Sequence, residues 1–179
     1  MKKGIPIVLM LLVALAATAC GGRGTVSDSE PGEDGTPGVE EAVAGEARIS
    51  VSPPEGWEAS DSSGMLYRYQ KGTASFMLKE ESHFTAGTLD TVVDRARDIF
   101  DGAFENVQYT GEPESIAVGG VDASRFGFTC ELGGIIMRYE YVYLIADGHV
   151  YAITFCDLGD TFDANTADFD AILRSVVIH

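Results

Sequence analysis

The longest regular alternation of apolar and polar residues lies in residues 124–156. Aromatic and β-branched residues alternate there with polar ones, and Gly133-Gly134 and Asp147-Gly148 interrupt them. Gly-Gly and Asp-Gly pairs between such runs are typical of tight β-hairpin turns. The pattern therefore predicts three long antiparallel strands in a meander, and the fold depends on this sheet.

Shorter alternating runs before the meander predict further strands, and Gly-Gly, Lys-Gly or Pro-Pro pairs separate several of them. These runs are residues 48–52, 65–70, 73–80, 107–110 and 115–118, followed by a long strand over 121–132 that enters the meander. If Gln70 pairs with Thr73 across a turn at Lys71-Gly72, the apolar residues of the second and third runs share one face.

Two stretches have the period of an amphipathic helix. In residues 88–103 the apolar positions recur every three or four residues, with Thr88 as the N-cap and charged residues on the opposite side. Residues 166–176 repeat the pattern with Phe169, Ile172, Leu173 and Val176. Strands with one central and one C-terminal helix predict an α+β fold, in which helices pack on one large antiparallel sheet.

The two meander turns fix the register of the long strands. With Leu132 opposite Ile135 and Ala146 opposite His149, one face of the sheet carries a row of aromatic residues: Tyr139, Tyr141, Tyr143, Phe126 and Phe128. We expect this row to be either a core layer under a helix or, in part, an open groove for a small apolar ligand or an extended peptide.

The opposite face divides into an apolar and a charged part. Its apolar part, which includes Val142, Leu144 and Ile153, requires a helix over it. Its charged part is Glu131, Arg138, Glu140 and Asp157, which we expect to form a solvated end of the sheet with an ion pair from Arg138 to Asp157 or Glu131.

The same register bears on Cys130 and Cys156. Cys130 falls opposite Met137 and Cys156 opposite Tyr139, so the two thiols share a face but lie two strands apart. Two strand spacings are about 9.5 Å, whereas a disulfide needs Cβ atoms within about 4.5 Å. We predict two free thiols, mostly buried.

The N-terminal residues indicate export. Lys2 and Lys3 precede an apolar run that ends in small residues, which is typical of a signal peptide over residues 1–19. The sequence Ala-Thr-Ala-Cys ending at Cys20 resembles a bacterial lipobox. This resemblance implies that Cys20 becomes the first residue and carries acyl chains such as palmitate; ordinary secretion with an unmodified Cys20 is the alternative.

Residues 20–46 contain Gly, Ser, Thr, Pro and acidic residues with almost no large apolar side chain, and they predict a disordered tether. Residues 47–179 remain for one α+β domain. The chain has 12 basic and 28 acidic residues, and removal of the signal peptide would take away two of the lysines. Such acidity excludes nucleic acid as a partner, because binding to phosphates depends on Lys and Arg.

No motif indicates catalysis, a cofactor or a metal. Asp157, Asp160 and Asp163 are three residues apart, and they lack the alternating spacing of a calcium loop; helix capping by Asp163 or Thr166 is the simpler expectation. His83, His149 and His179 are scattered. A thiol-dependent enzyme would need an activated nucleophile, and His149 and Cys156 point to opposite sides of one strand.

Four features occur in an order that resembles a known superfamily. They are Pro54-Glu55-Gly56-Trp57 after the first strand, Gly119-Gly120 before a long strand, Asp147-Gly148 before an aromatic strand, and a closing Phe-x-x-Ile-Leu-x-Ser from Phe169 to Ser175. This order is similar to the PsbP-like or Mog-type α/β/α sandwich. That superfamily includes a photosystem II accessory protein, a Ran-binding factor and many bacterial lipoproteins of unknown role. The resemblance implies binding or assembly work, and no residue role carries over.

These observations lead to one interpretation of function and one alternative. We expect a lipid-anchored binding or assembly module on the extracytoplasmic face of the cell membrane, without catalysis and with a protein partner in the cell envelope. The alternative is a carrier that holds a small apolar ligand or peptide on the tyrosine-rich face. A partner protein that co-purifies would favour the module, and a bound lipid or metabolite would favour the carrier.

Overall fold

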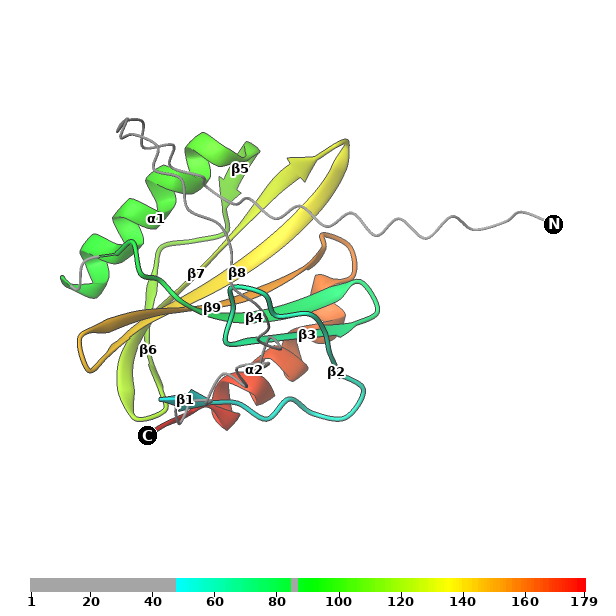
Figure 1. Cartoon of the computed structure of the whole chain (residues 1–179). Helices are drawn as coiled ribbons and strands as arrows, with labels where there is room; N and C mark the ends of the chain where they lie inside the picture. The colour runs from blue at the N-terminus through cyan, green and yellow to red at the C-terminus, as the bar shows by residue number, and fades with distance from the viewer. Residues whose placement is uncertain (1–47, 85–86) are drawn as a thin grey trace, which may run out of the picture. The chain divides into compact units, whose positions relative to one another are not determined.

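The computed structural model of the chain describes residues 48–84 and 87–179 (Figure 1). The predicted signal peptide, Cys20 and the tether over residues 20–46 lie outside the described residues. The described part contains an eight-stranded antiparallel sheet in the order β2-β3-β4-β9-β8-β7-β5, with β6 also paired to β7. Its strands are β2 (Glu58–Ala59), β3 (Tyr67–Lys71), β4 (Ala74–Glu80), β5 (Glu105–Tyr109), β6 (Glu114–Val118), β7 (Val121–Leu132), β8 (Ile135–Ala146) and β9 (His149–Leu158).

The meander of β7, β8 and β9 has the predicted register. Leu132 pairs with Ile135, Cys130 with Met137, and Cys156 with Tyr139. The turn residues Asp147 and Gly148 have φ angles of 49° and 79°, and this left-handed conformation suits a tight hairpin. The sequence prediction of three long antiparallel strands is therefore confirmed.

The hairpin of β3 and β4 differs from the predicted register by two residues. Gln70 pairs with Ser75 rather than Thr73, because the two-residue turn is Gly72-Thr73. Side chains alternate between faces with a period of two, so a shift of two keeps each side chain on its predicted face. Tyr69 and Phe76 consequently still share the predicted apolar face.

Helix α1 (Leu89–Ala103) begins at the predicted N-cap, Thr88. The Thr88 hydroxyl accepts a hydrogen bond from the Thr91 amide, and the Thr91 hydroxyl accepts one from the Thr88 amide, which forms a capping box. The apolar side of α1 packs on the sheet over β7 and β8 and forms one hydrophobic core with Phe126, Phe128 and Tyr143.

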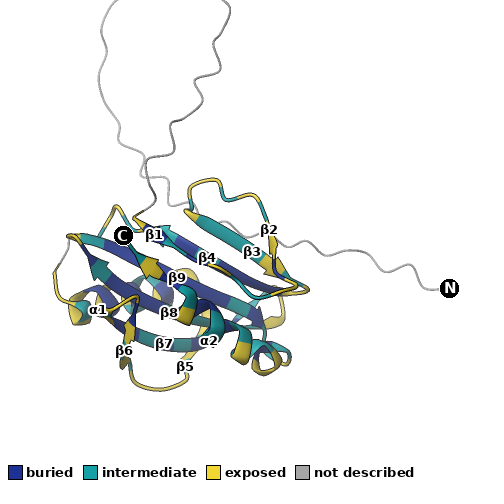
Figure 2. Ribbon diagram, turned by 90° about the horizontal axis from the view of Figure 1, so that it is seen from below, coloured by how far each residue is buried: buried dark blue, intermediate teal, exposed yellow. Residues whose placement is uncertain are grey.

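Helix α2 (Thr166–Ser175) covers the opposite face of the sheet. The sequence predicted both this helix and an apolar face that needs a helix over it. Phe169 and Ile172 pack in a second core with Val142 and Leu144, which alternate along β8 with the residues under α1. Figure 2 shows buried residues along the central strands β4, β9, β8 and β7, and exposed ones mainly on loops and on the outer sides of the helices. The arrangement is α+β, which confirms the predicted fold class.

The strand predicted over residues 48–52 is present but is only two residues long, β1 (Ile49–Ser50). Three short elements have no counterpart in the sequence prediction. One of them is β10 (Val177–Ile178), which follows α2 and pairs with β1 in a separate two-stranded sheet. Strand β2 pairs with β3, and a 3₁₀ helix, η1 (Phe162–Asn165), precedes α2. Trp57 closes one end of the core, where its ring packs on Phe169 and its Nε1 donates a hydrogen bond to Asp168.

Candidate functional site

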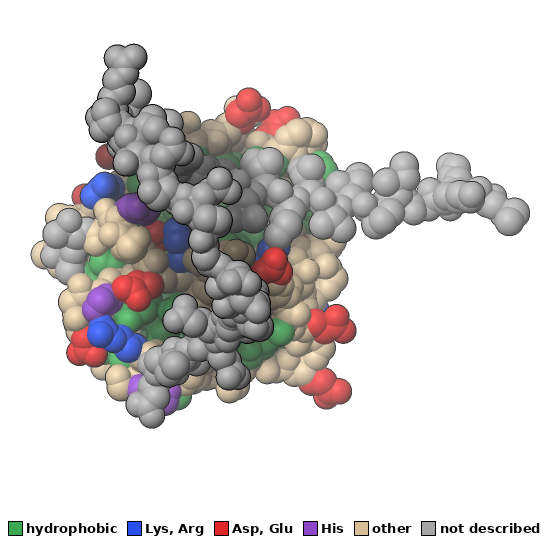
Figure 3. Space-filling view, in the orientation of Figure 1, with side chains coloured by type: hydrophobic (Ala, Val, Ile, Leu, Met, Phe, Trp, Pro, Cys, Tyr) green, Lys and Arg blue, Asp and Glu red, His purple; other side chains and the backbone are tan. Residues whose placement is uncertain are grey.

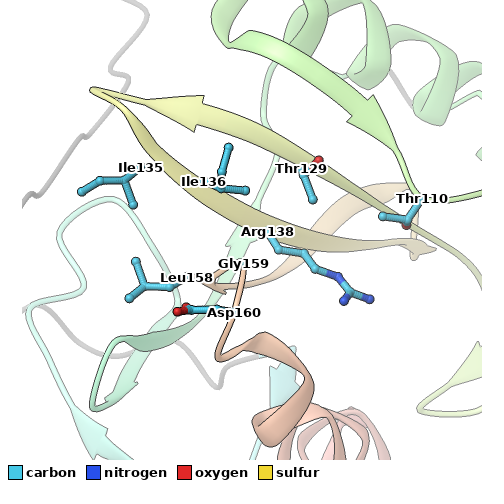
Figure 4. Close-up of a pocket in the computed structure, with 8 residues that line it drawn as sticks. All are labelled: Thr110, Thr129, Ile135, Ile136, Arg138, Leu158, Gly159 and Asp160. Atoms are coloured by element: carbon cyan, nitrogen blue, oxygen red, sulfur yellow. The ribbon is translucent and has the colours of Figure 1, made fainter.

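An open groove of about 680 Å³ lies beside the β7–β8 hairpin, and we call it the hairpin groove. In Figure 4 the apolar side chains gather toward the hairpin end, whereas Arg138, Thr129 and Thr110 lie toward the other end. Its lining residues are Thr110, Thr129, Ile135, Ile136, Arg138, Leu158, Gly159 and Asp160. It is the candidate site because it combines exposed apolar surface with nearby polar groups.

Strand pairing sets the positions of the groove residues. Thr129 and Arg138 are opposite one another on β7 and β8, and their side chains project from the face that α2 covers elsewhere. The chain after β9 returns to β8, where the Gly159 amide donates to the Ile136 carbonyl at 2.9 Å. A Cβ on Gly159 would lie 3.0 Å from Ile136 Cγ2, so glycine permits this close approach.

The wall of the groove next to β5 depends on a second close approach. The Thr110 amide donates a hydrogen bond to the Gly127 carbonyl at 2.9 Å, which brings the end of β5 onto β7. A Cβ on Gly127 would lie 2.8 Å from Thr110 Oγ1. Glycine at this position therefore lets Thr110 reach the groove.

The hairpin groove contains two exposed isoleucines. Ile136 is 54% exposed and Ile135 is 38% exposed, although both lie in a regular strand. Isolated apolar side chains on a surface are common, but adjacent ones in a groove with a polar margin are typical of a contact surface. The arrangement can hold an apolar side chain, with the threonine hydroxyls and Arg138 as hydrogen-bonding groups.

Arg138 does not form either of the predicted ion pairs. Its Nη1 donates to Asp163 Oδ1 at 2.8 Å, and its guanidinium lies 4.4 Å from the centre of the Phe162 ring. Both partners belong to η1, which folds back over the end of the sheet. The predicted pairs with Asp157 and Glu131 are wrong, because the prediction considered only residues on neighbouring strands. The Asp163 carboxylate is 82% exposed, so the observed pair of Arg138 and Asp163 contributes less than about 1 kcal/mol.

Asp157 is buried, which corrects the prediction that it lies at a solvated end of the sheet. Its Oδ1 accepts hydrogen bonds from the Thr73 hydroxyl at 2.6 Å and the Leu158 amide at 2.8 Å. Its Oδ2 accepts one from the Asn165 side-chain amide at 2.9 Å. The carboxylate thus connects the β3–β4 turn, the end of β9 and η1.

Glu140 is also mostly buried, contrary to the same prediction. Its carboxylate forms an ion pair with Arg125 at 2.8 Å, and Arg125 also binds Asp170 of α2 at 3.2 Å. Only 12% of the Glu140 side chain is exposed. The fourth predicted member, Glu131, accepts a hydrogen bond from Asn106 at the sheet edge.

The three aspartates that the sequence offers as a loose cation site have separate roles. Asp157 accepts three hydrogen bonds, Asp163 pairs with Arg138, and Asp160 is exposed beside the hairpin groove. Within residues 48–84 and 87–179, no three His, Cys, Asp or Glu side chains are grouped so as to hold a metal ion. Neither Asp163 nor Thr166 is the N-cap of α2, which is Asn165; Thr166 is instead the C-cap residue of η1, where its amide donates to the Asp163 carbonyl.

The predicted tyrosine row lies beneath α1. The Phe100 ring of α1 is 4.6 Å from that of Tyr141, and the rings of the row stack on one another along β7 and β8. Phe126, Phe128 and Tyr143 are buried, whereas Tyr139 and Tyr141 keep partly exposed edges. Burial raises the pKa of Tyr139, Tyr141 and Tyr143, and the geometry favours a packed layer over most of the row.

Both described cysteines are free, as the register predicts. Cys130 is buried under α1, and the Cys156 thiol lies 3.0 Å from the Ser75 hydroxyl. Burial raises the pKa of Cys130 to about 11 and also raises that of Cys156. Both thiols are therefore protonated at neutral pH, whereas the nucleophilic form of a cysteine is the thiolate.

Two of the three histidines, His149 and His179, have polar partners that account for their positions without a catalytic role. His149 lies 2.6 Å from the Glu80 carboxylate on β4, and His179 lies 2.9 Å from the Ser50 hydroxyl on β1. Among the described residues, no helix is both long enough and apolar enough to cross a bilayer.

Sequence reasoning did not identify the hairpin groove. The signal that could have identified it is the pair Ile135-Ile136 directly after Gly133-Gly134. Adjacent residues of a strand point to opposite faces, so one of two consecutive isoleucines at a hairpin end should lie on the face away from α1. The lining from Thr110 and Gly159 depends on how distant loops return to the sheet.

In sequence, the chain matches no protein-family model and no curated protein. In structure it is similar to LpqN of Mycobacterium tuberculosis, described as involved in cell envelope biogenesis, with 14% identity, 73% of this chain and 82% of that chain covered, and a TM-score of 0.56. It is similar to PA94 of Pseudomonas aeruginosa, described as a putative regulator of unknown function, with 12% identity, 76% and 88% coverage, and a TM-score of 0.55. It is also similar to the cyanobacterial PsbP of Synechocystis, with 14% identity, 76% and 96% coverage, and a TM-score of 0.51. The chain therefore has a PsbP-like fold.

Proposed function

We propose that this protein is a lipid-anchored, extracytoplasmic binding or assembly module that contacts another protein of the cell envelope through the hairpin groove. The observation that carries the proposal is the exposed pair Ile135 and Ile136 within that groove. Covering apolar surface contributes about 25 cal/mol for each Å² removed from water. A partner that removes both isoleucine side chains from water thus gains binding energy, because the described residues of this chain leave them exposed.

Two further observations support a place in the envelope. The sequence ending at Cys20 resembles a lipobox after a signal peptide, which implies anchoring by acyl chains to the membrane. The structural neighbour LpqN is involved in cell envelope biogenesis, although at 14% identity the likeness itself concerns the fold. Acidic side chains over residues 28–41 would repel one another and hold the folded part clear of the lipid surface.

The protonated thiols favour binding over catalysis. A thiol-dependent enzyme lowers the pKa of its nucleophile with a nearby cation or base. In this protein burial raises the pKa of Cys130 and Cys156. The partner of Cys156 is the Ser75 hydroxyl, which is neutral and cannot act as the base.

In-cell photo-crosslinking tests the contact. A benzophenone amino acid is placed at Ile136 and, as a matched control, at Val177, which is 49% exposed on β10. We expect one adduct of defined mass from position 136 and none from position 177. The adduct should disappear when Ile135→Asp is added to the same chain. Equal labelling from both positions, or no adduct from position 136, would contradict the proposal.

The anchor is tested separately by mass spectrometry of the N-terminal peptide from membrane-extracted protein. We expect the mature chain to begin at Cys20 with three acyl chains or with diacylglycerol alone. A mature chain that begins at another residue, or an unmodified Cys20, would exclude lipid anchoring but leave the groove contact open.

The carrier function has one observation in its favour, the partly exposed edges of Tyr139 and Tyr141 at the border of the aromatic layer. A ligand there would lie beside α1, because Phe100 and Phe104 already pack on the rings of Tyr141 and Tyr139. Native mass spectrometry distinguishes the two functions, because a carrier retains a lipid or metabolite of constant mass whereas the module is recovered without one.

A further inference from the structure

Strand β6 forms part of one edge of the sheet and has an unused hydrogen-bonding side. It pairs with the first half of β7, and among the described strands it has no second neighbour (Figure 1). The two-residue turn Gly119-Gly120 makes Val118 and Val121 a hydrogen-bonded pair. Every second residue then bonds to β7, so the amide and carbonyl groups of Ser115 and Ala117 point away from the sheet.

The free side of β6 is accessible. Ser115 and Ala117 are both exposed, and none of the hydrogen bonds among the described residues uses their outward backbone groups. An exposed edge of this kind can accept another strand. The five residues of β6 are enough to pair with a short extended peptide. Each outward-pointing residue of β6 can exchange two backbone hydrogen bonds with the peptide.

A second groove, of about 460 Å³, lies between β6 and the C-terminal half of α2, and we call it the edge groove. Residues 116–120 line it on one side, and Asp170, Arg174 and Arg125 contribute its charged groups. A strand added to β6 would direct every second side chain toward α2 and into this groove.

The charges of the edge groove favour an acidic side chain. Arg125 is neutralised, because it binds Glu140 at 2.8 Å and Asp170 at 3.2 Å. Arg174 is exposed, and no described carboxylate lies within ion-pair distance of it. The two arginines and the two carboxylates sum to zero charge, but Arg174 is the one cation lining the groove that forms no ion pair among the described residues. An acidic side chain can therefore bind Arg174 directly, although the chain has a formal net charge of −16 and Figure 3 shows acidic side chains at several points of the face.

The two ends of β6 differ in charge. Glu114 pairs across the strands with Arg125, so Glu114, Arg125 and Asp170 lie at one end. Arg174 is one helical turn beyond Asp170, and the turn at Gly119 approaches the nearby Val176 carbonyl, so Arg174 lies at the other end. An acidic residue of a bound peptide should therefore face the Gly119 end.

We propose that β6 and the edge groove bind an extended segment of a partner protein, which adds a strand to β6 and places an acidic side chain against Arg174. This surface uses neither Ile135 nor Ile136, so it is independent of the hairpin groove. The backbone hydrogen bonds supply affinity for any extended segment, and Arg174 supplies the preference for an acidic one.

A peptide selection tests the proposal. Random linear 12-residue peptides displayed on phage are selected against the purified full chain in detergent micelles, and the enriched peptides are labelled with fluorescein for anisotropy titration. We expect enrichment of sequences with β-branched residues and an acidic residue at alternate positions. Selection that yields no binder, or binders without an acidic residue, would overturn the proposal.

Variants of the chain then locate the binding surface. Ala117→Pro removes an outward amide while leaving the bonds to β7 intact, because proline is tolerated at strand edges. We expect it to weaken the selected peptides about tenfold, and Arg174→Glu to weaken them at least as much. The matched control Arg95→Glu, on the exposed side of α1, should leave affinity unchanged.

Methylation of the peptide backbone provides a test that does not depend on the folding of Ala117→Pro. N-methyl groups at the alternate positions that face β6 should abolish binding, and N-methyl groups at the intervening positions should not. Equal effects of the two patterns would overturn strand addition. Sedimentation must also show a monomer at the concentrations used, because a dimer that Ala117→Pro dissociates would make a second copy the occupant and overturn the proposed partner.

Discussion

Asp157 connects three parts of the fold through one buried carboxylate, and its truncation should be costly. In Asp157→Ala the Thr73 hydroxyl, the Leu158 amide and the Asn165 side-chain amide all lose their acceptor. A hydrogen bond to a charged group contributes about 1.5–3 kcal/mol. Thr73 is exposed and Asn165 is half-buried, so both can partly rehydrate, and we expect a loss of about 2–4 kcal/mol in the free energy of unfolding.

Asp157→Asn separates the hydrogen bonds from the charge. The new carbonyl can still accept from Thr73 and Leu158, and the new amide faces Asn165, whose side chain can turn to present its own oxygen. We therefore expect Asp157→Asn to cost about 1 kcal/mol, which is at most about half the cost of the alanine variant.

Urea unfolding measures both variants, with the fluorescence of Trp57, the one tryptophan of the chain, as the probe. Asp160→Ala is the matched control, because Asp160 is exposed three residues away and its truncation should stay within about 0.5 kcal/mol of the wild type. If Asp157→Ala costs less than about 1 kcal/mol, or if Asp157→Asn costs as much as Asp157→Ala, the hydrogen-bonding argument is refuted.

Three further predictions follow from the packing and the pKa shifts. Phe100→Ala should lower the free energy of unfolding, measured in urea titrations, by about 3–5 kcal/mol, because Phe100 packs against four other rings. A loss below about 1 kcal/mol would mean that the packing of α1 on the tyrosine row contributes little to stability. Hydrogen bonds from Lys71 and Trp57 lower the pKa of Asp168, so the carboxylate stabilises the fold above its unfolded pKa of about 3.9 and loses this effect as pH falls through its folded pKa. Asp168→Asn should therefore lower the urea midpoint near neutral pH, and this effect should shrink as the pH is lowered below about 3.9; an effect of constant size would contradict the assignment. Cys130 should react with iodoacetamide on the order of 100-fold more slowly in the folded than in the unfolded chain, because its pKa rises from 9.0 to about 11; equal rates would contradict its burial.

The register of the central strands could be predicted because both turns are encoded locally. Gly133-Gly134 and Asp147-Gly148 each allow the left-handed backbone that a two-residue turn needs. Once the turns are placed, the period of two assigns every side chain of β7, β8 and β9 to a face. The same reasoning failed by two residues at β3–β4, where Lys71-Gly72 and Gly72-Thr73 are both reasonable turns.

The short pairings could not be predicted. Strands β1 and β10 are two residues each and meet across more than 120 positions of the chain. Two residues provide no periodicity, and their pairing depends on where α2 ends relative to the sheet. The burial of Asp157 has the same origin, since it depends on η1 and the β3–β4 turn meeting above the end of β9.

The hairpin groove lies on a part of the sheet that α2 leaves uncovered, because α2 is much shorter than β7 and β8. Strands β7 and β8 have 12 residues each and extend about 40 Å, whereas α2 has 10 residues and extends about 15 Å. One short helix cannot cover such a face from end to end, so part of the sheet must meet solvent or a partner. Thr129 and Arg138 suit contact with water, but Ile136 between the turn and Arg138 does not. Part of the Ile136 side chain packs on Gly159, but more than half of the side chain is exposed, so packing within the described residues uses only part of its apolar surface. The partner contact proposed for the hairpin groove would cover the remaining exposed part of this side chain.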